Sequence, residues 1–304
     1  MYDIIVIGGA NLDLLVKTKS ETLKHKEHLD LCYHLGEKIL ISHLFSFTGG
    51  GGTNTAVAFS RLGLKTAFIG CLGDDINGKI ILDELKKEKV SFLGKIKKGE
   101  TGHSIILPGR GDRTILVSKG VNNDLNFKNI KLSNLKAKLL YISTLLGESF
   151  KTAEKLASFA SKKGIKIAFN PSIYLARQAS KLFSFLKKVD ILILNKEEAE
   201  ALSKRKEIKD ILRILEKSIK PVGIVVITSG NKGIYACQDS KIYIKKIKSI
   251  NPVDSTGAGD AFASGFAYGI IKNKGIKKAI DYGHKEALSV LSHLGAKNNL
   301  LKRL

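Results

Sequence analysis

Short apolar runs alternate along the chain with segments of helical periodicity. The apolar runs predict strands at residues 4–7, 66–70, 139–143, 166–170, 191–194 and 223–228. Helical patterns intervene at residues 53–62, 78–88, 150–163, 196–202 and 206–218. This alternation predicts an α/β fold, in which parallel βαβ units form a mostly parallel central sheet with helices on both faces.

Two regions do not follow the helical pattern. Residues 16–47 have no clear period, and in residues 102–118 two apolar runs flank the polar segment Gly109-Arg-Gly-Asp-Arg113. Both regions predict hairpins or extended excursions from the main sheet. Since no internal repeat or proline-rich linker interrupts the chain, we expect a single domain over residues 1–304. His25 and His28 lie in the first region and are expected to be solvated, because no third ligand stands at a metal-binding spacing.

Composition and charge exclude some classes of protein. No apolar run reaches the roughly 18 residues that a membrane span requires, which favours a cytoplasmic protein with no membrane partner. The three cysteines lie far apart and have no C-x-x-C spacing, so neither a disulfide framework nor a zinc site is indicated. The net charge of +23 is the feature that favours nucleic acid as a partner. However, only seven of the 51 basic residues are arginine, and the lysines are scattered, which disfavours that partner.

The stretch Asn251-Pro-Val-Asp-Ser-Thr-Gly-Ala-Gly-Asp260-Ala-Phe262 carries the clearest chemistry. If a helix begins near Thr256, the free N–H groups of Gly257, Ala258 and Gly259 point outward and favour an anion such as phosphate. Asp260 would face the same anion, where a carboxylate is suited to take a proton from a substrate hydroxyl. An ordinary helix start is the structural alternative.

Two other glycine patterns fit rival nucleotide folds poorly. Gly8-Gly9-Ala-Asn-Leu-Asp13 follows the first strand but lacks the G-x-G-x-x-G spacing, which disfavours a Rossmann dehydrogenase. Gly73-Asp-Asp-Ile-Asn-Gly78-Lys79-Ile80 has isoleucine where a P-loop needs the hydroxyl that binds magnesium. A structural turn ahead of a helix is the better reading of this second pattern.

Several motifs in sequence order resemble those of the ribokinase-like (PfkB) carbohydrate and nucleoside kinases. Asp254-Ser-Thr-Gly-Ala-Gly-Asp260 is similar to their C-terminal signature, and Gly49-Gly-Gly-Gly-Thr-Asn54 is similar to their N-terminal glycine-rich motif. Between them, Asn195-Lys-Glu-Glu198 and Thr228-Ser-Gly230-Asn-Lys-Gly233 resemble the metal-site and nucleotide-loop motifs. The resemblance covers nearly the whole chain. It implies a three-layer α/β/α fold, in which residues 16–47 and 102–118 form a small β lid that mediates dimers in many members.

A polyol site is expected near the N-terminal motifs. Asp13 offers a carboxylate that accepts two hydroxyl protons, and Asn11 and Asn54 offer amides that donate or accept. The glycines from Gly49 onward, including Gly50, allow the backbone to approach a ligand closely. The resemblance implies the same substrate-binding role for Asn11, Asp13, Gly50 and Asn54. Their structural alternatives are an Asx turn at Asp13 and a helix cap at Asn54.

A nucleotide and its metal are expected further along the chain. Asn195 and Glu198 stand three apart at a helix start, so both can hold a hydrated Mg²⁺ through water. In open α/β sheets the ligand lies beyond the carboxyl ends of the strands, where Asn11, Asn170, Asn195 and Thr228 would converge. The resemblance implies nucleotide contacts for a further group of residues and a K⁺ contact for Asp254. The nucleotide group is Thr228, Gly230, Gly233 and His284.

The sequence therefore predicts an ATP-dependent phosphotransferase with an alcohol group as acceptor. Asp260 would deprotonate a hydroxyl that attacks the γ-phosphorus, and the amides of residues 257–259 together with Mg²⁺ would meet the developing charge. Ribose or another pentose is expected first as the acceptor. A nucleoside is the first alternative, followed by a ketodeoxy acid or a phosphosugar. The non-enzymatic alternative is a basic nucleotide- or nucleic-acid-binding protein.

Overall fold

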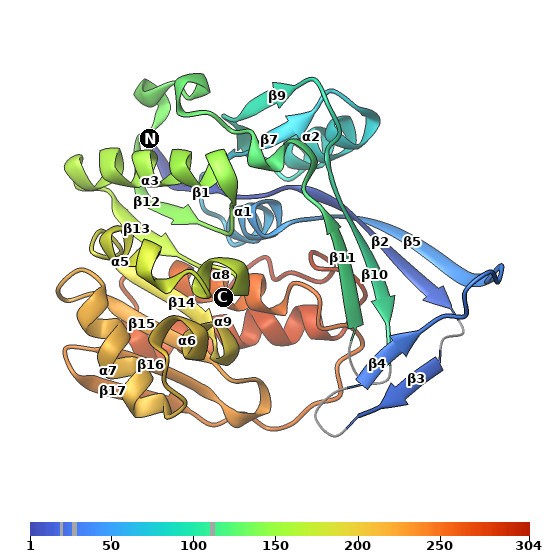
Figure 1. Cartoon of the computed structure of the whole chain (residues 1–304). Helices are drawn as coiled ribbons and strands as arrows, with labels where there is room; N and C mark the ends of the chain where they lie inside the picture. Colours follow the sequence, from blue (N-terminus) through green and yellow to red (C-terminus); the bar gives the residue numbers. More distant parts are fainter. Residues whose placement is uncertain (19–20, 26–28, 110–112) are drawn as a thin grey trace.

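The computed structural model describes residues 1–18, 21–25, 29–109 and 113–304. His28 and most of the predicted polar turn after Gly109 lie outside these ranges. Within the described residues, nine strands form a large sheet in the order β17-β16-β15-β14-β13-β12-β1-β6-β8 (Figure 1). All neighbours pair in parallel except β15 with β16 and β16 with β17. In chain order these strands are Tyr2–Ile7, Thr66–Ile69, Ser91–Phe92, Ala137–Ile142, Lys166–Phe169, Ile191–Asn195, Ile224–Thr228, Ile234–Gln238 and Lys241–Lys245.

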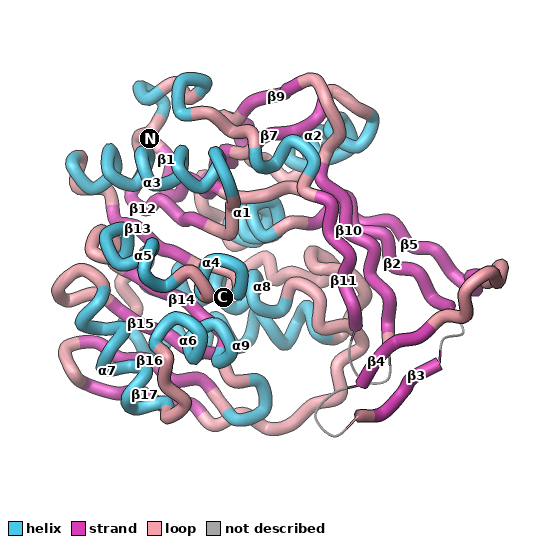
Figure 2. Tube along the Cα trace, in the orientation of Figure 1, coloured by secondary structure: helices cyan, strands magenta, loops and turns pink. Residues whose placement is uncertain are grey.

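Helices cover both faces of the large sheet. One face carries α3 (Gly147–Lys162), α5 (Ala179–Leu186), α6 (Lys196–Ser203) and α7 (Ile208–Ser218), with the short α4 (Ile173–Ala176) beside them (Figure 2). The other face carries α1 (Gly51–Arg61), α2 (Ile76–Lys87), α8 (Ala258–Ile271) and α9 (Gly275–Leu291). The predicted α/β class and three-layer arrangement are confirmed.

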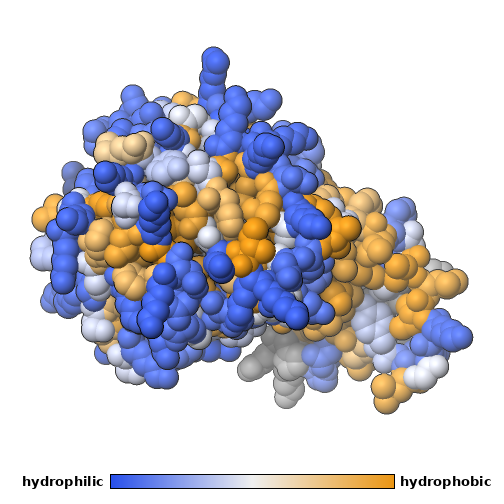
Figure 3. Space-filling view, turned by 90° about the horizontal axis from the view of Figure 1, so that it is seen from above, coloured by the Kyte–Doolittle hydropathy of each residue, from blue (hydrophilic) through white to orange (hydrophobic). Residues whose placement is uncertain are grey.

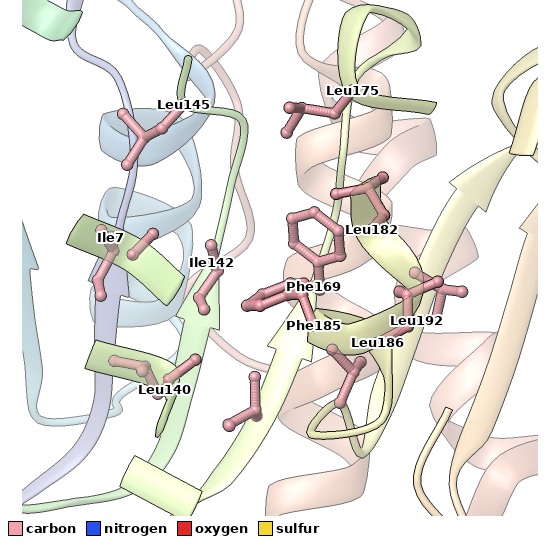
Figure 4. Packing of buried hydrophobic residues seen from close by; sticks show 14 of the residues in the cluster. Ile7, Leu140, Ile142, Leu145, Phe169, Leu175, Leu182, Phe185, Leu186 and Leu192 are labelled. Carbon is pink, nitrogen blue, oxygen red and sulfur yellow. The ribbon is translucent and has the colours of Figure 1, made fainter. Parts of the chain in front are cut away.

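Alternate side chains of the central strands supply the two halves of the core. In β1, Ile5 and Ile7 pack on the α3 face, whereas Ile4 and Val6 pack on the α8 face. The period of two in a strand makes this division, and burial on both faces explains the continuous apolar runs of the sequence. On the α3 face the aromatic rings of Phe169 and Phe185 meet edge to face, with centroids 4.8 Å apart (Figure 4).

A second, four-stranded sheet projects from the body with the order β11-β10-β2-β5 (Figure 1). Its strands are β2 (Asn11–Thr18), β5 (Ile41–Gly49), β10 (Gly102–Pro108) and β11 (Arg113–Ser118). Beyond it lies the hairpin of β3 (Glu21–Lys24) and β4 (Leu29–Cys32). The sheet thus draws on both irregular regions of the sequence, but β2 begins earlier than residue 16, so that Asn11 and Asp13 belong to a strand.

The remaining elements connect these parts. A small parallel pair joins β7 (Cys71–Gly73) to β9 (Lys95–Lys97), and three 3-10 turns cover Gly120–Asn123, Phe127–Asn129 and Leu132–Asn134. A fourth 3-10 turn covers Gly230–Lys232. The pattern Gly73-Asp-Asp is a turn ahead of α2, where the Asp75 carboxylate accepts the Gly78 N–H at 2.8 Å. Because β1 leads into β2 and no helix follows Gly8-Gly9, a Rossmann phosphate loop is absent from this described segment.

One buried carboxyl in the α8 face of the core should make stability depend on pH. Burial raises the pKa of Glu286 in α9 to about 8, despite the opposing effects of the Leu301 backbone and of Arg61. The folded pKa therefore exceeds the usual value of 4.5, so the folded protein binds more protons than the unfolded chain between these values. Stability should fall as pH rises through this window.

Replacing Glu286 with glutamine should remove that dependence. We expect the stability of Glu286→Gln relative to the unchanged protein to increase from pH 5 to pH 8, by at most about 1.4 kcal/mol per pH unit. Urea unfolding at several pH values measures the difference. Glu197→Gln, at an exposed position of α6, is the matched control and should show no trend. Parallel pH curves for Glu286→Gln and the unchanged protein would contradict the assignment.

Candidate active site

The functional residues of the two distant glycine motifs meet at one point. The Asn54 amide of α1 donates a hydrogen bond to Asp260 Oδ2 of α8 at 2.8 Å. Asp260 is partly buried, and desolvation raises the pKa of its carboxyl above the usual value, with a further increase from the charge of Asp13. The Asn54 hydrogen bond and the charge of Lys297 act in the opposite direction. The arrangement holds a basic carboxylate in a fixed orientation, as a general base requires.

A cavity of about 330 Å³ opens in front of Asp260 at the carboxyl ends of the strands. It brings together residues that are far apart in sequence, including all four that were expected to converge. The predicted site residues that line it are Asn11, Gly50, Asn195, Glu198, Thr228, Gly257, Gly259 and Asp260.

A second cavity of about 390 Å³ lies on the other side of the α8 N-terminus. It shares Thr228, Gly259 and Phe262 with the first cavity. Its walls are mostly apolar and come from Ile234, Ile247, Ile250, Pro252, Ala287, Leu288 and Leu291, together with Gly230, Ala258 and His284. Desolvation lowers the pKa of His284, so this ring is neutral at pH 7. Apolar walls with a few polar groups suit a flat heterocycle.

The N-terminus of α8 lies where the two cavities meet. The helix begins at Ala258, later than the expected start near Thr256, because Gly257 adopts a left-handed conformation with φ of 77°. The Ala258 N–H donates to the Ser255 carbonyl at 3.4 Å. No intramolecular acceptor among the described residues takes the N–H of Gly257 or Gly259. Backbone donors of this kind, at the positive end of a helix, bind anions.

Several predicted residues lie behind the cavity and do not line it. Asp13 is 8 % exposed and lies directly over Gly49, where an added Cβ would come within 1.8 Å of Asp13 Oδ2. Asp254 accepts the N–H of Thr256 and of Gly295, each at 2.9 Å, and so ties the loop before α8 to the C-terminal segment. Gly233 lies in the β15–β16 turn, where its carbonyl accepts the Ser229 N–H at 2.9 Å.

Asn195 and Glu198 form a reciprocal capping box at the start of α6. The Glu198 N–H donates to Asn195 Oδ1 at 2.8 Å, and the Asn195 N–H donates to Glu198 Oε2 at 2.9 Å. Desolvation raises the pKa of Glu198 to about 7, with an added contribution from the charge of Asp260. Two carboxyl groups of one cavity that hinder each other's ionisation fit a bound divalent cation, which would offset both charges. The chemistry of these two carboxyl groups therefore fits Mg²⁺, and the position of the ion stays a prediction.

No cluster of three or more His, Cys, Asp or Glu side chains able to hold a metal ion occurs in the part of the chain that the structure describes. His25 is exposed and pairs with Asp30 at 2.9 Å. Among the same residues, no helix is long and apolar enough to cross a membrane.

The cavity also contains polar residues that the motifs did not reveal. The Asn122 side chain accepts the Ala10 N–H at 2.9 Å. It donates to the Ala10 carbonyl at 2.8 Å and to Asn11 Oδ1 at 2.9 Å. Arg113 of β11 donates to the Ser255 hydroxyl, so the second sheet reaches the loop that precedes α8. Lys119 and Ser143 line the cavity as well. In the sequence, Asn122 could have been found only from the polar run Gly120-Val-Asn-Asn-Asp124 to which it belongs.

A carboxylate suited to act as a general base, beside a helix N-terminus suited to bind a phosphate, has the groups that a phosphotransferase acting on a hydroxyl group needs. Residues 3–303 match the model of the pfkB family carbohydrate kinases, and the chain belongs to that family. The predicted enzyme class is thereby confirmed.

Proteins similar in sequence belong to the same class. An uncharacterized sugar kinase of Archaeoglobus fulgidus is 31% identical over 253 residues, which cover 80% of this chain and 98% of that protein. The ribokinase of Bacillus subtilis is 27% identical over 308 residues, with 100% and 97% of the two chains covered.

Solved structures confirm the fold. The ribokinase of Giardia lamblia has a TM-score of 0.85 at 21% identity and covers 100% of this chain and 98% of its own. The adenosine kinase of Sinorhizobium meliloti has a TM-score of 0.84 at 20% identity and covers 99% and 97%. Since ribokinase and adenosine kinase structures are equally similar, this likeness leaves the acceptor open.

Gly259 provides a test of the anion site. An added Cβ at Gly259 would meet no atom within 4 Å, because this position faces the space shared by the two cavities. Gly259→Ala should therefore fold normally, while its methyl group keeps a phosphate from the helix N-terminus. We expect kinase turnover to fall by about 10²-fold, as measured by ADP release.

Gly257→Ala is the contrasting variant. Its Cβ would lie 2.3 Å from the Ala296 Cβ, and its φ of 77° is unfavourable for alanine. We expect this variant to lose thermal stability, whereas Gly259→Ala keeps it. Full turnover in Gly259→Ala would show that the anion does not bind at this helix end.

Proposed function

We propose that this chain is an ATP-dependent kinase that transfers the γ-phosphoryl group to a hydroxyl of a small sugar, with ribose or another pentose as the preferred acceptor. The observation that carries the proposal is the partly buried Asp260 carboxylate, held by Asn54 at the point where a polar and an apolar cavity meet. The polar cavity takes the acceptor, and the apolar cavity takes the adenine. The phosphates then lie at the N-terminus of α8, between the two.

The reaction follows from this arrangement. Asp260 removes the proton of the acceptor hydroxyl, whose oxygen forms a bond to the γ-phosphorus while the bond to the ADP oxygen breaks. The raised pKa of Asp260 makes it a stronger base than an exposed aspartate. The free N–H groups of Gly257 and Gly259 stabilise the charge on the phosphoryl oxygens. Mg²⁺, held through water by Asn195 and Glu198, would neutralise part of the phosphate charge.

Polar side chains at the acceptor end support a polyol. Amide and hydroxyl groups line this end and can donate to or accept from several sugar hydroxyls. They belong to Asn11, Asn122, Asn123, Ser143, Asn170 and Ser172. Gly50, directly after β5, lines the same cavity, and Asp13 of β2, which lies behind the cavity wall in this structure, is proposed to bind the acceptor with it. A nucleoside would also need an apolar slot for its base, and among the described residues that line this cavity the amides and hydroxyls named above are joined by fewer apolar side chains, such as Leu145, Leu146 and Pro171.

We propose that the four-stranded sheet acts as a lid within a single kinase domain. Its Arg113 already contacts Ser255 beside the catalytic loop, which supports closure over the acceptor. Such closure would exclude water and so protect ATP from hydrolysis. An ATP-dependent reaction also supports the cytoplasm as the place where the enzyme works.

The catalytic assignment is tested by Asp260→Asn. The amide is similar in shape but cannot take a proton, so turnover should fall by about 10²–10⁴-fold while ATP still binds. ADP release is measured with Mg-ATP and K⁺ against pentoses, hexoses, ketodeoxy acids, phosphosugars and nucleosides. Turnover on a pentose that disappears in the variant supports the proposal. Rapid turnover on a nucleoside instead would identify a nucleoside kinase, and an Asp260→Asn enzyme at full rate would refute the general base.

The same assay tests the metals. Replacing K⁺ with tetramethylammonium should lower turnover if Asp254 helps to bind a monovalent cation, as its position in the loop before α8 suggests. Chelation of Mg²⁺ should abolish turnover.

The lid also supports a homodimer. Its edge strands expose apolar side chains, among them Leu44 of β5 and Ile115 and Leu116 of β11. Figure 3 shows hydrophobic residues gathered on the projecting part of the molecule. Exposed apolar edge strands tend to pair with another chain. We expect a dimer in analytical ultracentrifugation and a monomer for Leu116→Lys. An unchanged monomer at all concentrations would contradict this.

A further inference from the structure

A buried ammonium group lies outside both cavities. Lys297, in the segment after α9, is 5 % exposed. Its Nζ donates to Glu84 Oε2 of α2 at 2.5 Å and to the Thr48 hydroxyl of β5 at 2.9 Å. Thr48 in turn donates to Glu84 Oε1. Burying a charge costs free energy even when it is paired, so we expect Lys297 to have a role other than stabilising the fold.

The same cluster extends to α1. Arg61 binds both carboxylate oxygens of Glu88 at 2.9 and 2.7 Å, and its Nη1 donates to the Lys297 carbonyl at 2.7 Å. Arg61 thus binds the backbone of the C-terminal segment, whereas the Lys297 ammonium contacts Thr48 of β5. The two cations can be removed separately.

The end of β5 connects Lys297 to the acceptor site. Thr48 directly precedes Gly49, and the Asp13 carboxylate lies against the α-carbon of Gly49. Strand pairing places Leu12 opposite Thr48 and Asn11 opposite Gly49. Because Lys297 binds Thr48, it also fixes the position of Gly49, against which the Asp13 carboxylate lies.

Electrostatics points to the same connection. Burial raises the pKa of Asp13, and the charge of Asp254 raises it further. The Ser104 hydrogen bond and the Lys297 ammonium lower it. Asp260 is also close enough for the charge of Asp13 to raise its pKa. Burial and the charge of Asp254 thus disfavour the ionisation of Asp13, and the charge of Lys297 opposes them.

We propose that Lys297 is a positioning residue for the acceptor: its buried ammonium, bound to Thr48 and Glu84, holds the end of β5 against which the Asp13 carboxylate lies. Asp13 can then accept hydrogen bonds from two acceptor hydroxyls in a fixed orientation. The inference rests on the proposed function, because it assigns Asp13 to acceptor binding. Glu84, Asp13 and Arg61 are the charged groups that act on Lys297 itself.

Lys297→Met removes the charge and keeps a side chain of similar length. Without the ammonium the pKa of Asp13 rises, so the acid limb of kcat/KM for D-ribose should move to higher pH. The KM for ribose should rise about tenfold, the equivalent of one pKa unit, with a smaller change in kcat. Because Lys297 also lowers the pKa of Asp260, ribose binding is measured by calorimetry in an Asp260→Asn background as well, where Asp260 no longer titrates and Glu198, which lines the same cavity, is common to all variants.

Arg61→Met is the matched control, since it loosens the same segment and leaves the ammonium beside β5. We expect a lower Tm, a ribose KM within about twofold and an unmoved acid limb. Lys297→Arg keeps the positive charge, so the acid limb of its kcat/KM should lie where that of the unchanged enzyme lies. Lys297→Gln should shift the acid limb to higher pH as Lys297→Met does, and it takes the place of Lys297→Met if that variant fails to fold.

An acid limb in Lys297→Gln at the position of the unchanged enzyme would overturn the proposal and leave Lys297 as a structural tie. Equal effects of Lys297→Met and Arg61→Met on KM and on the limb would do the same. If the unchanged enzyme phosphorylates no pentose, the proposed acceptor is wrong. The binding series is then repeated with the acceptor that the panel identifies, and the same shift of the limb remains the required result.

Discussion

A close approach of two glycine segments is the constraint on which the active site depends. The Gly52 N–H at the start of α1 donates to the Gly9 carbonyl just beyond β1 at 3.0 Å. A Cβ on Gly52 would lie 2.7 Å from the Gly8 carbonyl carbon, so a larger side chain would force α1 away from the sheet. This contact fixes the first turn of α1 against the end of β1, and from that turn Asn54 donates to Asp260 of α8.

The site concentrates partly or fully buried carboxyl groups, which is unfavourable for stability. Desolvation raises the pKa of Asp13, Glu198 and Asp260, and the charge of Asp13 raises that of Asp260 further, as the charge of Asp260 does for Glu198. Folding free energy is therefore used to keep basic carboxylates in a small polar space, as is common where proton transfer occurs. The Lys297 ammonium, which lies outside the cavity, reduces that cost at Asp13 and Asp260.

The two cavities divide the chemistry between them. Their shared wall is the N-terminus of α8, where free backbone amides face the junction. One side is rich in amides and hydroxyls, and the other is mostly aliphatic. A molecule with a polar acceptor on one side and a heterocycle on the other would bring the reacting atoms to Asp260. The lid strand that carries Arg113 approaches the same junction from the second sheet.

The sequence by itself determined the strands β1, β6 and β12 to β15 of the central sheet, several of its helices and the motifs of the catalytic centre, but not β8, β16 or α9. Their signals are local: apolar runs for strands buried on both faces, and glycines followed by Asp260 for a helix start. It did not determine that α8 begins after a left-handed Gly257, or that β2 starts at Asn11, since both depend on pairing with distant segments. Tertiary structure alone brought Asn122, Arg113 and Lys297 to the site. Their roles follow from burial and from contacts across more than a hundred positions, as in the Lys297 to Thr48 bond with a separation of 249 residues, which no local pattern records.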